Sequence, residues 1–454
     1  MTSPGEVETV KIAFIVQRYG TEILGGSEYH CRLIAERMAE GHDVEVLTTC
    51  ARDYLTWRNE YAEGTDRVRG VTVRRFANGE TRDIGAFNRF SDWIFNYAHT
   101  REDELRWLRQ QGPWCPALLD YLRAHHASYD ILIFFTYLYA PTVLGLQVAP
   151  SRSILVPTAH DEPAIRLGIY REVFAAPAGI AFNTQVERRF LLSEFDVGAL
   201  AQETVGCGVD LPPVQGREAG EEDRGPRGGR LDGPTDRGTR ADGPSPEDAD
   251  QVTRGWRDDE ATAHGRFRIG PRGAAFRRRH RLRGPVLLYG GRIDPGKGCE
   301  ELFEYFRAYA AGGGAGTLAL MGAKLMPLPE EPWLRFAGML PERARLEALE
   351  AATVVAVPSP FESLSLLALE SFAVGTPILA NARSEVLVEH CRSSNAGLWY
   401  ADRDEFAEAL ALLVADERLR RALGHNGKQY VERNYRWDVI LAKYDRLIAR
   451  VRQA

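Results

Sequence analysis

The chain has 454 residues, of which 44% are hydrophobic and 26% are charged, and its formal net charge is −6 at pH 7. This length predicts two domains of about 150–200 residues each, and the mild negative charge excludes the basic surface typical of a nucleic-acid-binding protein. Six cysteines are scattered without a C-x-x-C spacing, which predicts reduced thiols in a cytoplasmic protein. The polar amino terminus and the lack of any apolar run of about 18 residues predict neither a signal peptide nor a membrane span.

The chain opens with an apolar run at residues 11–16, a loop containing Gly25 and Gly26, a helical pattern through Ala39, and a second apolar run at residues 44–48. This order predicts a β-α-β unit at the start of a parallel α/β domain. A pair of glycines lets a backbone approach a ligand closely, and the helix behind it offers free amides. The loop lacks the G-x-G-x-x-G pattern, which argues against a hydride-transfer enzyme, and a tight turn without any ligand explains the glycines equally well.

Residues 87–108 are rich in aromatic side chains, including Phe90, Trp93 and Trp107. Aromatic rings stack on sugars, but a stripe of them at helical spacing more often forms hydrophobic core. We therefore predict a core role for this stripe, with sugar stacking as the alternative.

An apolar strand expected at residues 154–159 runs directly into His160, Asp161 and Glu162. Parallel α/β sheets place their ligands at the carboxyl ends of strands, so His160 is a candidate active-site residue. Asp161 is expected to fix the tautomer of the imidazole. No histidine or cysteine lies at ligand spacing from the acidic pair, so we expect no metal site here.

Between residues 211 and 265 the composition shifts to glycine, arginine, proline and acidic residues. Such a segment cannot bury enough apolar surface to offset its ordering entropy, which predicts disorder, and its excess of acidic residues argues against RNA binding. Residues 266–283 are basic and contain no acidic residue. We predict an exposed helix ahead of the second domain, and the alternative is contact with anionic lipid, where each cation contributes about 1 kcal/mol.

The apolar run at residues 286–289 predicts a buried strand that ends at a glycine pair including Gly291. Arg292 and Lys297 follow in a glycine-rich turn, ahead of a helix expected to start near Glu300. A forked guanidinium and a compact ammonium together suit a diphosphate. Two ordinary surface cations are the alternative, which their position directly after a buried strand disfavours.

Two glutamates, Glu362 and Glu370, flank the start of a helix predicted at residues 365–374, which Ser363 or Ser365 is expected to cap. The free amides and the positive dipole end of this helix form an anion site between the two carboxylates. At 1.5 Å per residue the carboxylates are separated by roughly 8–12 Å, which suits a hexose, a diphosphate and a ribose in a row. A solvent-facing helix with two ordinary glutamates is the alternative, but Glu370 interrupts an apolar run where an unpaired carboxylate is costly.

The second half of the chain continues with strand and helix alternation, which predicts a second parallel α/β domain. Further strands are expected at residues 318–321, 335–339, 354–357 and 378–380. A terminal helix is expected to begin near Arg436.

The run Gly-Arg-Ile-Asp-Pro-Gly-Lys-Gly at residues 291–298, combined with Phe361, Glu362 and Glu370, resembles the donor site of retaining glycosyltransferases of family 4, within the glycosyl transferases group 1. The resemblance extends to the glycine loop and to His160. It implies the GT-B fold, in which two Rossmann-like α/β domains face each other across a cleft and the C-terminal helix crosses back to the first domain. The implied parts are an acceptor domain at 1–210, a disordered insert at 211–265, a nucleotide-sugar domain at 266–434 and the crossing helix at 435–454.

The resemblance also implies roles for individual residues. The implied catalytic residues are His160 and Glu362 beside the transferred sugar, and Arg292 and Lys297 on the diphosphate. The implied donor-binding residues are Gly25, Gly26, Gly291, Ser365, Leu366, Leu367 and Glu370, the last on the ribose. Many relatives have glycine where this chain has Ser365, whose side chain either crowds the phosphates or donates to them.

The function implied by the resemblance is transfer of a hexosyl group from a nucleotide-diphosphate sugar to a hydroxyl acceptor, with retention of configuration and with no metal or other cofactor. The acceptor would be a glycan or a lipid-linked molecule, in polysaccharide or glycolipid synthesis, with peripheral contact at the inner face of a membrane in the second case. One alternative is a nucleotide-sugar epimerase, which needs no acceptor. The other is a non-catalytic interaction subunit, which the intact charged residues of the motifs disfavour.

Overall fold

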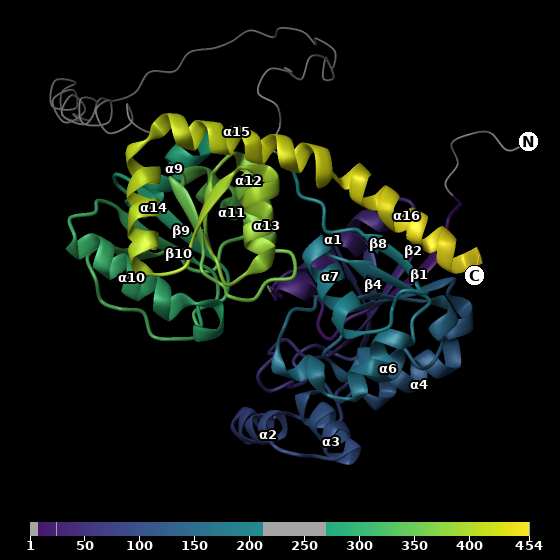
Figure 1. The fold of residues 1–454 in the computed structure, drawn as a ribbon. Helices are drawn as coiled ribbons and strands as arrows, with labels where there is room; N and C mark the ends of the chain where they lie inside the picture. Colours follow the sequence, from purple (N-terminus) through teal and green to yellow (C-terminus); the bar gives the residue numbers. More distant parts are fainter. Residues whose placement is uncertain (1–7, 24, 212–268, 454) are drawn as a thin grey trace, which may run out of the picture.

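The computed structural model describes residues 8–23, 25–211 and 269–453, which form two α/β domains joined by a long terminal helix pair (Figure 1). The predicted insert at 211–265 lies outside the described residues except for Leu211. No helix in the described part of the chain has both the length and the apolar character needed to cross a bilayer.

The first domain is built on an eight-stranded sheet that is parallel except at its β3–β4 edge. In spatial order its strands are β3 (Gly64–Val68), β4 (Val71–Phe76), β2 (Asp43–Thr49), β1 (Lys11–Ile15), β5 (Ile131–Phe135), β6 (Ser153–Val156), β7 (Gly179–Phe182) and β8 (Ala201–Thr204). The helices of this domain are α1 (Gly26–Met38), α2 (Ile84–Asn96), α3 (Arg101–Gln111), α4 (Pro116–His125), α5 (Ala140–Gly145), α6 (Ile169–Ala175) and α7 (Gln185–Glu194). The central strands are buried along their whole length, as expected for a parallel sheet covered on both faces.

The second domain has a six-stranded, entirely parallel sheet. In spatial order its strands are β11 (Leu334–Phe336), β10 (Thr317–Met321), β9 (Val286–Gly290), β12 (Val354–Val357), β13 (Ile378–Asn381) and β14 (Gly397–Tyr400). Its helices are α9 (Pro271–His280), α10 (Cys299–Ala311), α11 (Glu342–Ala351), α12 (Leu366–Val374), α13 (Glu385–Ser394), α14 (Arg403–Ala415) and α15 (Glu417–Asn434). Two Rossmann-like domains are therefore present, as the sequence predicted.

The last helix, α16 (Trp437–Gln453), leaves the second domain and packs on the first, as Figure 1 shows. Its apolar face lies against β6, β7 and β8, and Arg450 on its polar face pairs with Glu203 at 2.9 Å. This arrangement confirms the predicted crossing of the C-terminal helix back to the first domain.

Two predicted strands are shorter in the structure than the sequence indicated. The strand expected at 154–159 ends at Val156, because Pro157 cannot donate to the sheet and Thr158 has a left-handed backbone (φ 51°). The strand expected at 335–339 ends at Phe336, just before the left-handed Gly338 (φ 81°). The six cysteines are buried and unpaired.

The core role predicted for the aromatic stripe at 87–108 holds only in part, because Tyr97 is exposed and Phe90 and Phe95 are partly buried against the core. Phe87 and Trp107 are buried in the first domain, although Trp93 at the outer face of α2 remains partly exposed. The basic stretch forms α9, and the expectation that it is fully exposed is wrong for Arg277, which is buried and donates to the carbonyl of Ala351. Packing against α11 explains this difference, since α11 also supplies carboxylates to the neighbouring arginines.

Candidate functional site

A cavity of about 160 Å³ lies between the two domains and is called here the central cavity. Residues predicted from the sequence make up much of its lining, namely Gly26 of the first domain and Gly291, Arg292, Lys297, Glu362, Ser365, Leu366 and Leu367 of the second. The carboxyl ends of β9, β10 and β12 open onto it, which is where doubly wound sheets bind their ligands.

The start of α12 forms one wall of the central cavity. Ser365 is the N-cap and, with φ 65° and ψ 78°, has a left-handed backbone. Its side chain makes no capping hydrogen bond, so the predicted serine cap is wrong: in this conformation the hydroxyl does not reach the amides of the first turn. The amides of Leu366 and Leu367 have no carbonyl partner in the described part of the chain, which leaves the positive end of the helix available to an anion.

Lys297 and Glu362 form an ion pair on the wall of the central cavity. The Lys297 ammonium lies 2.8 Å from Oε1 of Glu362 and 3.4 Å from Oγ of Ser359. Asp294 caps the short helix Pro295–Lys297 by accepting from the Lys297 amide at 3.0 Å, which fixes the base of the lysine. The two predicted catalytic residues are therefore brought together, and the carboxylate orients the ammonium.

Arg292 reaches toward the first domain from the turn after β9. Its Nε lies 3.4 Å from Oδ2 of Asp294, and its guanidinium lies over the ring of Tyr54 at 5.2 Å. Gly291 precedes it with φ 148°, a backbone conformation that side-chain-bearing residues rarely adopt. Since Tyr54 belongs to the first domain, this cation–π contact holds Arg292 between the domains.

Glu370 lies behind the central cavity rather than on its lining. It is buried, pairs with Arg345 at 2.6 Å and accepts from the hydroxyl of Tyr29 at 3.5 Å. Burial raises the pKa of Glu370, and Arg345 opposes this shift. Arg345 and Tyr29 themselves line the cavity, so the ribose-binding role of Glu370 stays a prediction and would require Arg345 to share its carboxylate with the ligand.

Gly25 and Gly26, at the start of α1, have different surroundings. A Cβ on Gly25 would lie 2.1 Å from Oε2 of Glu28, which is buried and paired with Arg18 at 2.6 Å. A Cβ on Gly26 would meet nothing within 4 Å, and Gly26 lines the central cavity. Gly25 is thus required by packing, whereas Gly26 leaves open space beside the cavity.

His160 lies across the cleft from the Glu362 loop. Its ring stacks on Phe361 with the centroids 5.4 Å apart, and both lie on a neighbouring cavity of about 290 Å³ that Glu362 also lines. The expectation that Asp161 orients His160 is wrong, because Asp161 pairs with Arg166 at 2.6 Å. The nearest carboxylate is Glu162, whose Oε2 lies 3.6 Å from Nε2 of His160.

Sequence patterns did not reveal three residues of the site. Tyr29 and Arg345 line the central cavity, and Tyr54 supports Arg292. Arg345 lies in a helix without any motif, and only its contacts with Tyr29 and Glu370 show its place in the site. The contacts of Tyr29 with Arg345 and of Tyr54 with Arg292 join segments hundreds of residues apart, so no local sequence pattern indicates them.

Two Rossmann-like domains with a cavity between them and a C-terminal helix that crosses back to the first domain define the GT-B fold. Solved structures agree on the fold: sucrose-phosphate synthase from Thermosynechococcus elongatus has a TM-score of 0.65 at 17% identity, covering 97% of this chain and 98% of that one. HepE from Anabaena, in complex with UDP and glucose, has a TM-score of 0.60 at 14% identity, covering 97% and 99%.

Sequence comparison finds relatives over part of the chain. Residues 327–430 match the model described as glycosyl transferases group 1. The D-inositol 3-phosphate glycosyltransferases of Corynebacterium efficiens and Acidothermus cellulolyticus are 30% and 33% identical over 173 and 190 residues, which are 34% and 37% of this chain and 40% and 42% of those proteins. The chain therefore spans less than half the length of these relatives. The family match lies in the second domain, and together these matches support the resemblance to the glycosyl transferases group 1 that the motifs indicated.

Proposed function

We propose that the protein is a retaining glycosyltransferase of family 4 that transfers a hexosyl group from a nucleotide-diphosphate sugar to a hydroxyl acceptor. The observation that carries this proposal is the convergence of Arg292, Lys297 and the free amides of Leu366 and Leu367 on one interdomain cavity. Two cations and a helix N-terminus suit the two phosphates of such a donor.

The chemistry follows from where charge develops. As the bond between the anomeric carbon and the diphosphate oxygen breaks, negative charge grows on the leaving diphosphate, and groups fixed in advance stabilise it without reorganising. In the proposed front-face reaction the acceptor oxygen bonds to the anomeric carbon on the same face, and its proton passes to the departing phosphate oxygen. No protein base is needed in this scheme.

Glu362 and His160 are assigned to the transferred sugar. Glu362 lies on both the central cavity and the His160 cavity, so one carboxylate can contact the sugar while its other oxygen holds Lys297. A carboxylate accepts strongly from sugar hydroxyls, and His160 faces the same space across the cleft. The acceptor, a glycan or a lipid-linked alcohol, is proposed to enter from the first domain.

The experiment is a screen of UDP-glucose, UDP-GlcNAc and GDP-mannose by thermal shift and by product analysis. At least one donor is expected to stabilise the wild-type protein and to yield an α-configured product from an α-linked donor. Release of an isomerised sugar without acceptor would instead establish an epimerase. If no sugar nucleotide binds, the proposal fails and the protein acts as a non-catalytic subunit.

A further inference from the structure

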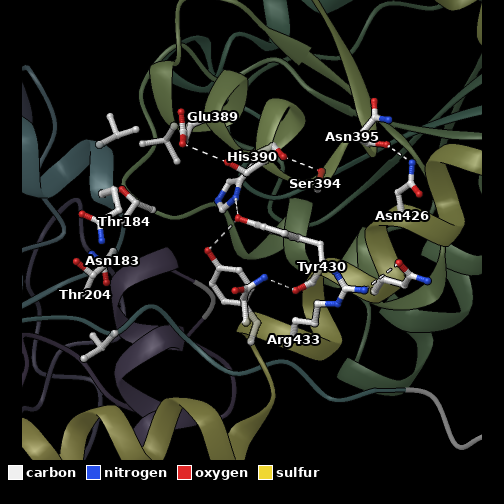
Figure 2. Close-up of a pocket in the computed structure, with 18 of the residues that line it drawn as sticks. Asn183, Thr184, Thr204, Glu389, His390, Ser394, Asn395, Asn426, Tyr430 and Arg433 are labelled. Carbon is white, nitrogen blue, oxygen red and sulfur yellow. Dashed lines mark hydrogen bonds between the residues drawn. The ribbon is translucent and has the colours of Figure 1, made fainter.

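A cavity that the proposed chemistry does not use lies at the junction of the two domains. It has a volume of about 640 Å³ and is called here the hinge cavity (Figure 2). The first domain contributes Asn183, Thr184 and Thr204, and α13 and α15 of the second domain form the opposite wall. A volume of this size is typical of small-molecule sites.

The hinge cavity lies where the chain passes between the domains. Tyr435, in the turn between α15 and α16, lines it, and its carbonyl accepts from the amide of Val209 at 3.0 Å. Val209 belongs to the segment that leaves β8. The chain thus borders the cavity at Val205, where it leaves β8, and at Tyr435, between α15 and α16, so a relative movement of the domains changes the shape of the cavity.

Two cations in the hinge cavity stand out by their lack of ion pairs. Arg433, on α15, has only the side-chain oxygen of Gln429 near its guanidinium, at 3.5 Å. Lys443, on α16, has only the carbonyl of Val205 at 3.5 Å. Neither has a carboxylate within 4.0 Å among the described residues, whereas many other arginines of the chain are paired.

The rest of the lining supplies hydrogen-bonding groups suited to hydroxyls. The amide side chains on the wall are Asn183, Gln185, Asn395, Asn426, Gln429 and Asn434. Glu389 is the single carboxylate among the lining residues, and it accepts from Ser393 at 3.2 Å. Positive charge combined with amides and hydroxyls fits a ligand that carries both a phosphate and several hydroxyl groups.

One side chain on the wall of this cavity connects it to the central cavity. His390 is buried, and its Nε2 donates to the carbonyl of Leu364 at 2.7 Å, in the loop between Glu362 and Ser365. Its Nδ1 accepts from the hydroxyl of Tyr430 at 3.3 Å. His390 therefore connects a ligand bound beside Tyr430 to the loop that carries Glu362 and Ser365, two residues of the central cavity.

We propose that the hinge cavity is a second binding site, for a small hydroxyl-rich phosphate monoester such as a sugar phosphate, and that its occupation favours binding at the central cavity. A phosphate bound by Arg433 and Lys443 bridges α15 of the second domain and α16, which packs on the first. Such a bridge stabilises the present arrangement, in which both domains line the central cavity.

Binding is tested by calorimetry with glucose 6-phosphate, using the full chain with Arg292→Gln so that the central anion site is weakened. Measurable binding is expected, and adding Arg433→Gln with Lys443→Gln should weaken it at least about tenfold. Arg418→Gln removes the same charge from an exposed arginine without an ion pair on α15 and should leave the affinity unchanged. Absence of binding, a smaller loss, or equal binding of glucose or inorganic phosphate would overturn the site.

If the variant with both Arg433→Gln and Lys443→Gln does not fold, Arg433→Gln alone is used, since Arg433 is exposed. This single change should weaken the affinity for glucose 6-phosphate at least about threefold. A loss below threefold would overturn the site equally.

The coupling rests on the proposed function and is tested separately. Saturating glucose 6-phosphate should tighten binding of the donor's nucleoside diphosphate to the wild-type protein by about threefold or more, and the diphosphate should tighten glucose 6-phosphate by the same factor. Tyr430→Phe should reduce this factor. Unchanged or weakened diphosphate binding overturns the coupling, whereas a protein that binds no nucleoside diphosphate refutes the proposed function and leaves the binding result standing.

Discussion

Ser365 combines a strained backbone with a position on the central cavity, so Ser365→Gly is expected to change stability and affinity in opposite directions. A left-handed backbone costs a residue with a Cβ about 1–2 kcal/mol. Glycine removes this cost, but its greater conformational freedom in the unfolded chain destabilises the folded state by about 0.4–1 kcal/mol. The net stabilisation is therefore about 0.5–1 kcal/mol, or a rise of about 1–3 °C in the melting temperature.

The same substitution removes a hydroxyl next to the free amides of α12. A hydrogen bond to a charged phosphate contributes about 1.5 kcal/mol, so the KM for the donor should rise roughly tenfold. The opposite expectation, that the side chain crowds the phosphates, predicts a lower KM. Thermal unfolding and steady-state kinetics on the same preparation measure both effects.

Arg281→Gly is the matched control for Ser365→Gly. Arg281 also has a left-handed backbone (φ 53°), but it ends α9 and does not line the central cavity. Both variants should gain similar stability, and only Ser365→Gly should change the KM. A lower melting temperature for Ser365→Gly, with a gain for Arg281→Gly, would show that the hydroxyl stabilises the fold and would refute this reasoning.

Three further predictions concern buried or bridging carboxylates. Glu362→Ala should lower the turnover number more than Glu370→Ala, because Glu362 lines the central cavity and Glu370 does not. Steady-state assays measure both turnover numbers. Equal losses of turnover with unchanged donor binding would contradict this division of roles. In denaturant unfolding, Glu370→Ala should lower the stability by about 3 kcal/mol because it leaves the half-buried Arg345 without its carboxylate partner. Glu385→Ala, which removes an exposed interdomain ion pair, should cost less than about 1 kcal/mol. Burial raises the pKa of Glu187 to about 8, above the unfolded value, so its contribution to stability is full below about pH 4.5 and is lost as the pH rises toward 8. The melting temperature of the wild type should accordingly fall relative to that of Glu187→Gln between pH 5 and 8.5, and a constant difference would contradict the shift.

The sequence predicted the fold because the information needed is local. Continuous apolar runs such as those of β9 and β12 mark buried parallel strands, and the glycine after α12 marks the end of that helix. Arg292, Lys297 and Glu362 were recognisable because each follows directly on such a strand. Their convergence on one cavity follows from the parallel sheet, whose strands all end on the same side.

The remaining features of the site depend on contacts between distant segments. Arg345 approaches Glu370 only when α11 packs beside α12, and Tyr29 reaches both from the other domain. The partner of Asp161 proved to be Arg166, because the turn after β6 directs the aspartate away from the histidine. Neither relation follows from spacing, since both depend on how a loop or a domain is oriented.

Arg292 and Lys297 of the second domain are proposed to bind the diphosphate of the donor. The most direct measurement is the Kd of the donor's nucleoside diphosphate and of the matching monophosphate for wild type and for Arg292→Gln with Lys297→Gln. Two lost charged hydrogen bonds should weaken the diphosphate about 100-fold while changing the monophosphate less than about threefold. Equal changes for the two nucleotides, or no change for either, would contradict the account.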